Sequence, residues 1–266
     1  MYNIKAHAKI NIFLKITGHE NGYHTLFSRF MRLDNLYDTI SFEPCKCDSF
    51  TIEGMDDVDL KSNTVYKAFV ALNDHTGNLD LLDFFYHHKV VIEKNIPSLA
   101  GLGGGSSDAG AFLRLANKVC DLQLDTPTLA QIGSSVGADV PFFVYDYPMA
   151  NVSGFGEIIE PFDEKPFEVE LFFPTIGCDT AQVYKTFKSD LLSNITPDKY
   201  IHWKELSSKE ILTQTSNAPQ ILNDLYAAAL IAYPDLKNEA PKGWFFSGSG
   251  STFFKPYDII ASKKEL

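Results

Sequence analysis

A glycine-rich segment that starts at Pro97, PSLAGLGGGSSDAG, is the part of the sequence best suited to chemistry. Four glycines between residues 101 and 105 lack Cβ atoms, so the backbone can adopt positive φ angles and approach a ligand closely. Ser106 and Ser107 follow where a helix is expected to begin. The first N–H groups of a helix have no internal partner and carry the positive end of its dipole. The segment therefore predicts an anion site that holds phosphate groups with backbone atoms.

The serine hydroxyls of the same segment can bind phosphate, and we predict Ser107 as a ligand for Mg²⁺, a hard cation that prefers oxygen. The predicted phosphate-binding residues are Pro97, Ser98, Leu99, Ala100, Gly101, Leu102, Gly103, Gly104, Gly105, Ser106 and Ser107.

Other glycine-rich and serine motifs fit less well. The Walker form requires Lys before its final hydroxyl residue, and Gly105 is followed by Ser106; the same serine stands where the dinucleotide form requires its last glycine. A flexible linker remains an alternative, although such linkers are seldom framed by a β-branched strand and a patterned helix. Residues 133–137 match the G-x-S-x-G elbow of hydrolases, but that elbow needs a preceding strand, and a short helix is expected there.

The elements that must position this segment follow from hydrophobic periodicity. The strand KVVIEK (89–94) leads into it, and Ala109, Phe112, Leu113 and Ala116 mark one helical face after it. A helix near residue 63 has Ser62 or Asn63 as its cap, and Thr126-Pro127 starts another, which we expect to end at Gly133. Further expected elements are strands at 40–43, 50–53 and 167–171, helices near 204–212 and 223–232, and a hairpin with a tight turn at 247–250.

Length and composition indicate a folded protein with two lobes. The chain has 266 residues, of which 45% are apolar and 21% charged, as in ordinary globular proteins. It carries 23 basic and 34 acidic side chains, a formal charge of −11, which disfavours nucleic acid as a partner. The longest apolar run, residues 225–233, is too short to span a bilayer.

Cationic side chains early in the sequence argue against a secretory leader, so we expect a cytoplasmic protein with no membrane partner. We accordingly expect the four cysteines, at positions 45, 47, 120 and 178, to be reduced thiols and neither metal ligands nor disulfides.

Residues 97–108 resemble the phosphate loop of the GHMP kinases (galactose, homoserine, mevalonate and phosphomevalonate kinases). With its triple glycine, the segment resembles the phosphate loop of one branch of this family, which acts on a polyol linked to cytidine diphosphate. Further matches are AKINIFLKITG from Ala8, GYH at 22–24, GADVPFF from Gly137, residues 180–184, 223–225 and SGSGST from Ser247. The resemblance implies an α+β, two-lobe GHMP-kinase fold. It has an N-terminal α/β nucleotide-binding lobe (residues 1–156) and a ferredoxin-like C-terminal lobe (157–266).

The resemblance also implies a reaction: ATP, with Mg²⁺, would phosphorylate the 2-hydroxyl of 4-(cytidine 5′-diphospho)-2-C-methyl-D-erythritol. Asp139 matches the family's catalytic carboxylate, which takes the hydroxyl proton; the alternative is an Asp that only caps a turn. Lys9 matches the catalytic lysine, which holds that carboxylate ionised; the alternative is a solvated lysine at a strand edge. Homoserine- or mevalonate-type kinases and a non-catalytic nucleotide-binding regulator remain competing hypotheses, and the chain is expected to be a monomer or weak homodimer.

Substrate residues follow from the same resemblance. Tyr23 and Tyr184 would stack on cytosine and His24 would read its edge, the alternative for His24 being a capping or core histidine. Thr180 and Asn11 are the remaining expected substrate ligands, and Asn63 and Lys94 match positions near the family's adenine pocket. The sequence departs from the family in two places: residues 19–21 are His-Glu-Asn where Arg-x-Asp is usual, and Gly110 replaces alanine in the helix after the loop.

Overall fold

The computed structural model describes residues 2–20, 22–55 and 58–257, and Asn21 of the divergent 19–21 stretch lies outside them. The chain forms two compact units that interleave in sequence. The first contains Met1–Ala8, Leu33–Pro97 and Gly103–Tyr147; the second contains Lys9–Arg32, Ser98–Leu102 and Pro148–Leu266. The predicted division of the sequence after residue 156 stays a prediction.

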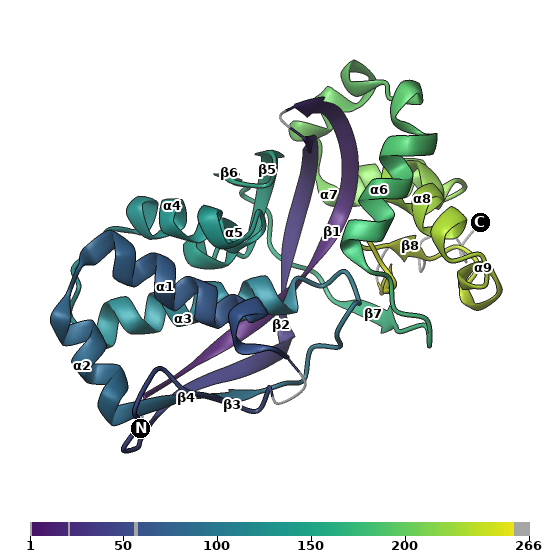
Figure 1. Ribbon diagram of the computed structural model, residues 1–266. Helices are drawn as coiled ribbons and strands as arrows, with labels where there is room; N and C mark the ends of the chain where they lie inside the picture. Colours follow the sequence, from purple (N-terminus) through teal and green to yellow (C-terminus); the bar gives the residue numbers. More distant parts are fainter. Residues whose placement is uncertain (1, 21, 56–57, 258–266) are drawn as a thin grey trace. The chain divides into compact units, whose positions relative to one another are not determined.

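Two long strands, β1 (Tyr2–Glu20) and β2 (Tyr23–Pro44), pair with each other and contribute residues to both units (Figure 1). The other elements of the first unit are, in chain order, β3 (Ile52–Glu53), η1 (Leu60–Ser62), α1 (Thr64–Thr76), α2 (Leu79–His87), β4 (His88–Glu93), α3 (Gly104–Val119), α4 (Thr126–Val136) and α5 (Val140–Tyr145).

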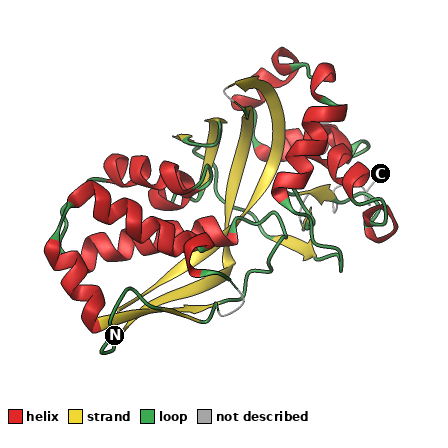
Figure 2. Cartoon of the chain, in the orientation of Figure 1, coloured by secondary structure: helices red, strands yellow, loops and turns green. Residues whose placement is uncertain are grey.

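The core of the first unit lies between its sheet and its helices. β4 pairs antiparallel with residues 39–44 of β2 and parallel with β3. Ile40, Phe42 and Val90 from these strands are fully buried against side chains of the helices, among them Phe85 and Phe112. α1 packs against α3 and α4, and α3 packs against α5. Figure 2 shows these helices as a layer over the strands. This packing fixes the direction of α3, which carries the second half of the glycine-rich segment.

The second unit contains two groups of strands. β5 (Met149–Gly154) pairs antiparallel with residues 26–31 of β2 and with β6 (Ile158–Pro161). β7 (Val169–Phe172), β9 (Phe253–Pro256) and β8 (Phe245–Phe246) form a separate antiparallel sheet in that order. The remaining elements are α6 (Thr180–Asp190), η2 (Leu192–Asn194), η3 (Pro197–Lys204), α7 (Ser208–Thr215), η4 (Pro219–Leu222), α8 (Asp224–Ala232) and α9 (Leu236–Glu239).

A buried arginine organises part of the second unit. The Arg29 guanidinium is fully buried and donates to the carbonyls of Trp203, Lys204 and Leu206, and its Nε donates to Asn151 Oδ1. Burial lowers its pKa to about 10, so the group stays charged at neutral pH. These bonds hold the end of η3 and the residues that follow it against β2.

Several predicted elements are confirmed and some boundaries were wrong. The strand before the glycine-rich segment, the helix after it and the Asn63 cap of α1 are present. The cap of α4 is Asp125 and not Thr126, because the Asp125 carboxylate accepts from the Thr128 N–H. α4 also continues past Gly133 to Val136, since Gly133 keeps helical geometry and its missing Cβ leaves room for Val140.

The predicted C-terminal hairpin is present as β8 and β9, and its tight turn at 247–250 is closed by the Gly250 N–H, which donates to the Ser247 carbonyl at 2.9 Å. Residues 247–252 form a six-residue loop that the Ser247 N–H closes onto the Thr252 carbonyl at 3.0 Å.

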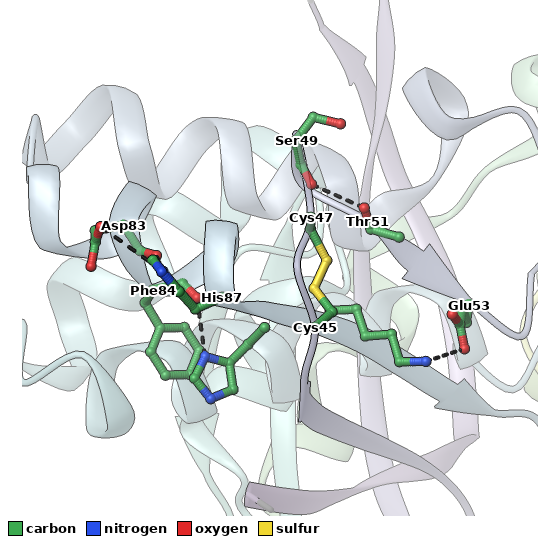
Figure 3. The surroundings of a disulfide bond; sticks show 10 residues. Cys45, Cys47, Ser49, Thr51, Glu53, Asp83, Phe84 and His87 are labelled. Carbon is green, nitrogen blue, oxygen red and sulfur yellow. Dashed lines mark hydrogen bonds and ion pairs between the residues drawn. A yellow bond between two sulfur atoms is a disulfide. The ribbon is translucent and has the colours of Figure 1, made fainter.

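The expectation that all cysteines are reduced was wrong for one pair. Cys45 and Cys47 form a disulfide just beyond β2 (Figure 3). Because the two residues are two apart in extended chain, their side chains share one side, and their Cα atoms lie 5.6 Å apart, within the range that a disulfide bridges. Cys120 and Cys178 are free, and burial raises the pKa of each thiol to about 11.

Over the described ranges, no helix is both long and apolar enough to cross a membrane.

Candidate functional site

The first half of the glycine-rich segment, residues 98–102, is held in the second unit by the loop between β8 and β9. The Leu99 carbonyl accepts from the N–H groups of Ser251 and Cys178, and the Ala100 carbonyl accepts from Thr252. Gly101 has φ +71° and lies so close to this loop that an added Cβ would be 2.5 Å from the Ser247 carbonyl oxygen. Glycine is therefore required at residue 101 for the two loops to meet.

Lys9 is fixed to the same segment. Its N–H donates to the Leu102 carbonyl at 3.0 Å, and its Nζ donates to the Gly101 carbonyl at 3.2 Å and to Asn11 Oδ1 at 2.6 Å. Lys9 and Asn11 are almost fully buried, which excludes the solvated strand-edge lysine that the sequence left open. Asn11 Nδ2 donates in turn to Ser28. Both ends of the Asn11 amide therefore have protein partners, and its Oδ1 helps to hold the Lys9 ammonium in place. The predicted contact of Asn11 with substrate stays a prediction.

The second half of the segment begins α3 in the first unit. Gly103 is the cap residue with φ +73°, and the first bond within the helix joins the Ser107 N–H to the Gly103 carbonyl at 2.8 Å. The N–H groups of residues 104–106 precede that bond and face the end of the helix, as an anion site requires. The Thr64 hydroxyl donates to the Gly105 carbonyl at 2.6 Å and thereby ties the start of α1 to this end of α3.

The two serines differ in their surroundings. Ser107 is buried and its hydroxyl donates to the His7 carbonyl at 2.7 Å, whereas Ser106 is half-buried at the end of the helix. The predicted role of Ser107 as a Mg²⁺ ligand stays a prediction, and Ser106 is the better exposed of the two hydroxyls. Among the described residues, no group of three or more His, Cys, Asp or Glu side chains could hold a metal ion.

Lys94 forms a charged cluster that the sequence did not indicate. Its Nζ is bonded to Asp38 Oδ2 and, at 2.7 Å, to Asp108 Oδ2. Asp38 Oδ1 also accepts from the Ile96 N–H at 2.8 Å. The cluster therefore ties β2, the residues after β4 and the first turns of α3 together.

Burial and charge set the ionisation of this cluster. Burial raises the pKa of Asp108 to about 7, although Lys94 opposes this shift. Burial lowers the pKa of Lys94, but its pairs with Asp108 and Asp38 outweigh that effect and raise it. Asp108 Oδ1 is buried without a hydrogen-bond partner. The expected adenine contact of Lys94 stays a prediction, and its ammonium is already engaged by two carboxylates.

Asp139 and Asn63 both stand at helix N-termini, but only the Asn63 side chain makes a capping hydrogen bond. Asn63 Oδ1 accepts from the Val65 N–H at 2.8 Å and so caps α1. Asp139 occupies the cap position of α5, yet its side chain makes no capping hydrogen bond. This argues against the alternative that Asp139 serves only as a cap. The Asp139 side chain is half-buried, and the turn that carries it starts at Gly137, beside the Ser106 hydroxyl.

A group of rings forms around His24 in the second unit. The imidazole centroid lies 5.3 Å from that of Tyr184, 5.7 Å from Phe187 and 5.0 Å from His19. Burial lowers the pKa of His24, and His19 and Lys188 lower it further. His24 and Tyr184 are therefore in contact, and their predicted roles at cytosine stay predictions. Phe187 and His19 are additional members of this group that the sequence reasoning missed.

Tyr23 and Thr180 have other neighbours. The Tyr23 side chain is 70% exposed and its ring lies 5.9 Å from Phe155. Thr180 is the first residue of α6, and its hydroxyl lies 2.8 Å from the Ser249 hydroxyl in the loop that also holds residues 99–101. Ser249 and Ser247 thus belong to the candidate site, and the SGSGST motif was their signal in the sequence.

The hydrolase alternative lacks its structural context. Ser135 lies inside α4, without the preceding strand that a nucleophile elbow requires, and its hydroxyl donates to the Ile132 carbonyl at 2.7 Å.

Comparison with known proteins covers almost the whole chain. Residues 63–147 match the family described as GHMP kinases N terminal domain. The chain is 60% identical over 258 residues, 97% of this chain and 100% of the relative, to 4-diphosphocytidyl-2-C-methyl-D-erythritol kinase of Sulfurovum sp. (strain NBC37-1). It is 43% identical to the protein of the same name from Sulfurimonas denitrificans, over 94% of this chain and 95% of the relative. A crystal structure of 4-(cytidine 5'-diphospho)-2C-methyl-D-erythritol kinase matches with a TM-score of 0.70 and 27% identity, and covers 96% of this chain and 90% of that one.

Proposed function

Because the chain belongs to the 4-diphosphocytidyl-2-C-methyl-D-erythritol kinases, an α+β, two-lobe branch of the GHMP kinases, we propose that it catalyses their reaction. ATP transfers its γ-phosphoryl group to the 2-hydroxyl of 4-(cytidine 5′-diphospho)-2-C-methyl-D-erythritol and leaves as ADP. The reaction belongs to the non-mevalonate route to isopentenyl diphosphate. The observation that carries this proposal is the 60% identity along 97% of the chain.

The residues divide the chemistry between them. The N–H groups at the start of α3 bind the phosphates of ATP. The Asp139 carboxylate accepts the proton of the 2-hydroxyl as its oxygen attacks the γ-phosphorus and the bond to the β-phosphate oxygen breaks. Lys9 supplies the positive charge that stabilises the developing alkoxide. The burial of Lys9 and its fixed partners support this role, as does an Asp139 side chain that is not used as a cap.

Magnesium fits the oxygen groups near the start of α3. Mg²⁺ keeps several waters and takes phosphate oxygens with one or two protein ligands, so it needs no dedicated cage. The Ser106 and Ser107 hydroxyls are the protein oxygens that would serve it there, and when bound it would neutralise charge on the transferred group.

The proposal also covers the substrate-binding residues, the cellular location and the oligomeric state. His24, Tyr184, Tyr23 and Thr180 bind the cytidine end and the polyol. The enzyme acts in the cytoplasm as a monomer or weak homodimer. Asn63 and Lys94 lie near the adenine ring of ATP.

Turnover of three alcohols tests the proposal. The purified chain is mixed with ATP, Mg²⁺ and the cytidine diphosphate substrate, homoserine or mevalonate, and ADP release is followed. We expect turnover of the cytidine substrate alone, and an Asp139→Asn preparation corrects for contaminating kinases. Turnover of homoserine or mevalonate without the cytidine substrate would refute the assignment. ATP binding with no turnover of any alcohol would favour a non-catalytic regulator.

A further inference from the structure

His19 and His24 form an imidazole pair at one end of the strands β1 and β2. Their ring centroids lie 5.0 Å apart at an interplanar angle of 79°. The Thr17 and Thr25 hydroxyls, which are hydrogen-bonded at 3.0 Å, link the two strands beside the pair. Tyr184 and Phe187 of α6 contact His24 on its other sides. The pair is therefore positioned by ring contacts and by the two strands that carry it. The Nε2 atoms make no polar contact that contributes to this.

Both Nε2 atoms of this pair lack a partner. In the described part of the chain five buried side-chain polar atoms have no hydrogen bond, and His19 Nε2 and His24 Nε2 are two of them. A buried polar atom without a partner is unfavourable and rare in folded proteins. Two such atoms in one contacting pair indicate a site whose hydrogen-bonding partner is a ligand.

We infer that His19, which stands where the family usually has an arginine, is a specificity-determining residue that binds the polar edge of the substrate's base together with His24. The inference rests on the proposed function, since it assigns part of the cytidine site. It adds a residue for which the family resemblance implied no role.

The chemistry of the pair suits an aminopyrimidine. A neutral imidazole has one N–H donor and one acceptor nitrogen, and the amino group and ring nitrogen of cytosine present one donor and one acceptor side by side. Two imidazoles can therefore satisfy both groups of the base at once. A single imidazole cannot, because its two nitrogens point in different directions and only one of them can face the base. The nearest aromatic ring, Tyr184, supplies the stacking surface, which does not by itself choose between bases. Because both Nε2 atoms are covered, each imidazole must rotate before its Nε2 can meet the base.

Three variants at residue 19 separate hydrogen bonding from packing. His19→Phe keeps a ring against His24 but has no polar atom, His19→Gln keeps a donor and an acceptor, and His19→Ala removes both. His87→Phe is the matched control, since His87 is an exposed histidine in the other unit. The measurements are the Kd for cytidine monophosphate by calorimetry, the KM values for the cytidine substrate and ATP, kcat, and the thermal midpoint.

We expect His19→Phe and His19→Ala to weaken cytidine monophosphate binding about tenfold, the effect of one lost hydrogen bond to a buried group. The KM for the cytidine substrate should rise in parallel, with kcat and the KM for ATP within about twofold of the wild type. His19→Gln should recover most of the binding. His19→Phe should fold at least as stably as the wild type, because replacing an unpartnered polar atom by an apolar one of similar shape is neutral or stabilising.

Unchanged affinity in His19→Phe would overturn the inference and assign His19 to packing. If His19→Ala does not fold, the cytidine monophosphate affinities of His19→Phe and His19→Gln still distinguish hydrogen bonding from packing. Failure of the proposed function looks different: the wild type itself would neither bind cytidine monophosphate nor turn over the cytidine substrate.

Discussion

At the scale of single residues, the site combines side chains held in place by protein partners. Lys9 is oriented by Asn11 and by the Gly101 carbonyl, so its position does not depend on substrate. Asp139 stands at the cap position of α5 and makes no capping hydrogen bond with its side chain. Its carboxylate is the proposed general base, and this role leads to a prediction.

Asp139→Asn should lower kcat by about 100-fold or more, because a positioned general base contributes about 10²–10⁴-fold. The KM for ATP should change little, since the proposal assigns phosphate binding to the backbone of α3 and not to Asp139. Asp125→Asn is the matched control: Asp125 caps α4 in the same unit, and asparagine caps equally well. Steady-state kinetics of both variants measure the effect, and an Asp139→Asn enzyme with wild-type kcat would remove the assigned base.

Tyr184→Ala should raise the KM for the cytidine substrate about 5- to 150-fold, which corresponds to the roughly 1–3 kcal/mol of a base stacked on an aromatic ring. The KM for ATP should stay the same, because the proposal places the ATP phosphates at α3 and not at Tyr184. Tyr257→Ala removes an exposed ring of the same unit and serves as the control. Equal increases in both KM values would instead assign the Tyr184 ring to packing.

At the scale of elements, α3 is placed by contacts in the first half of the helix. Near its start, Asp108 pairs with Lys94, and farther along Gly110 lies against α5. An added Cβ at residue 110 would be 2.7 Å from Phe143 Cβ and 3.1 Å from the Phe143 backbone carbon. The glycine that costs helix propensity therefore permits a close approach of α3 to the short helix that Asp139 precedes.

Gly110→Ala should lower the free energy of unfolding by up to about 2 kcal/mol, because overpacking against backbone costs about 1–3 kcal/mol and the gain in helix propensity offsets about 1 kcal/mol of it. Urea unfolding measures the change. Ser134→Ala, on the exposed side of α4, should stay within about 0.5 kcal/mol of the wild type. A Gly110→Ala protein that is more stable than the wild type would show that α5 can move away at no cost.

Asp108 makes the stability of the first unit depend on pH. Its folded pKa of about 7 lies above the value of about 3.9 for an unfolded chain. Protonated Asp108 therefore contributes stability that is complete below pH 4 and is lost as pH rises to 7 and above. Relative to Asp108→Asn, which does not titrate, the wild type should lose about 1–3 kcal/mol between pH 5 and pH 8.

The comparison with the variant is needed because His24, whose pKa is lowered, changes stability in the opposite direction. Urea unfolding of both proteins at the two pH values gives the difference. Asp125→Asn is again the control: hydrogen bonds from Thr128 lower the pKa of that exposed carboxyl, so it is ionised at both pH values. An equal pH response in wild type and Asp108→Asn would show that Asp108 is ionised throughout.

The sequence predicted the local parts of this arrangement and missed the distant ones. A strand, a glycine-rich turn and a patterned helix are properties of neighbouring residues, and so is the Asn63 cap. The pair of Lys94 with Asp38 joins residues 56 positions apart, and hydrophobic periodicity carries no information on such pairs. For the same reason Ser249 and Thr180 were recognised as motifs while their hydrogen bond was not.

At the scale of the whole molecule, a chain with a net charge of −11 binds a polyanion. In the proposed site, backbone dipoles bind the phosphates. Lys94, whose Nζ lies 3.5 Å from a Cβ built on Gly104 at the start of α3, is already shared by two carboxylates. Long-range repulsion should therefore act on ATP without a compensating excess of cationic side chains around the phosphates.

Raising the ionic strength from about 0.02 M to about 0.2 M shortens the Debye length to less than about 10 Å and screens this repulsion. We expect the KM for ATP to fall or stay constant at fixed free Mg²⁺, whereas an anion site built from exposed lysines would show a rising KM. The inhibition constant of adenosine, which is uncharged, is the control and should not respond to salt. A KM for ATP that rises several-fold would mean that cationic side chains, and not the helix N-terminus, dominate phosphate binding, and the backbone cradle at residues 103–106 would then be only part of the site.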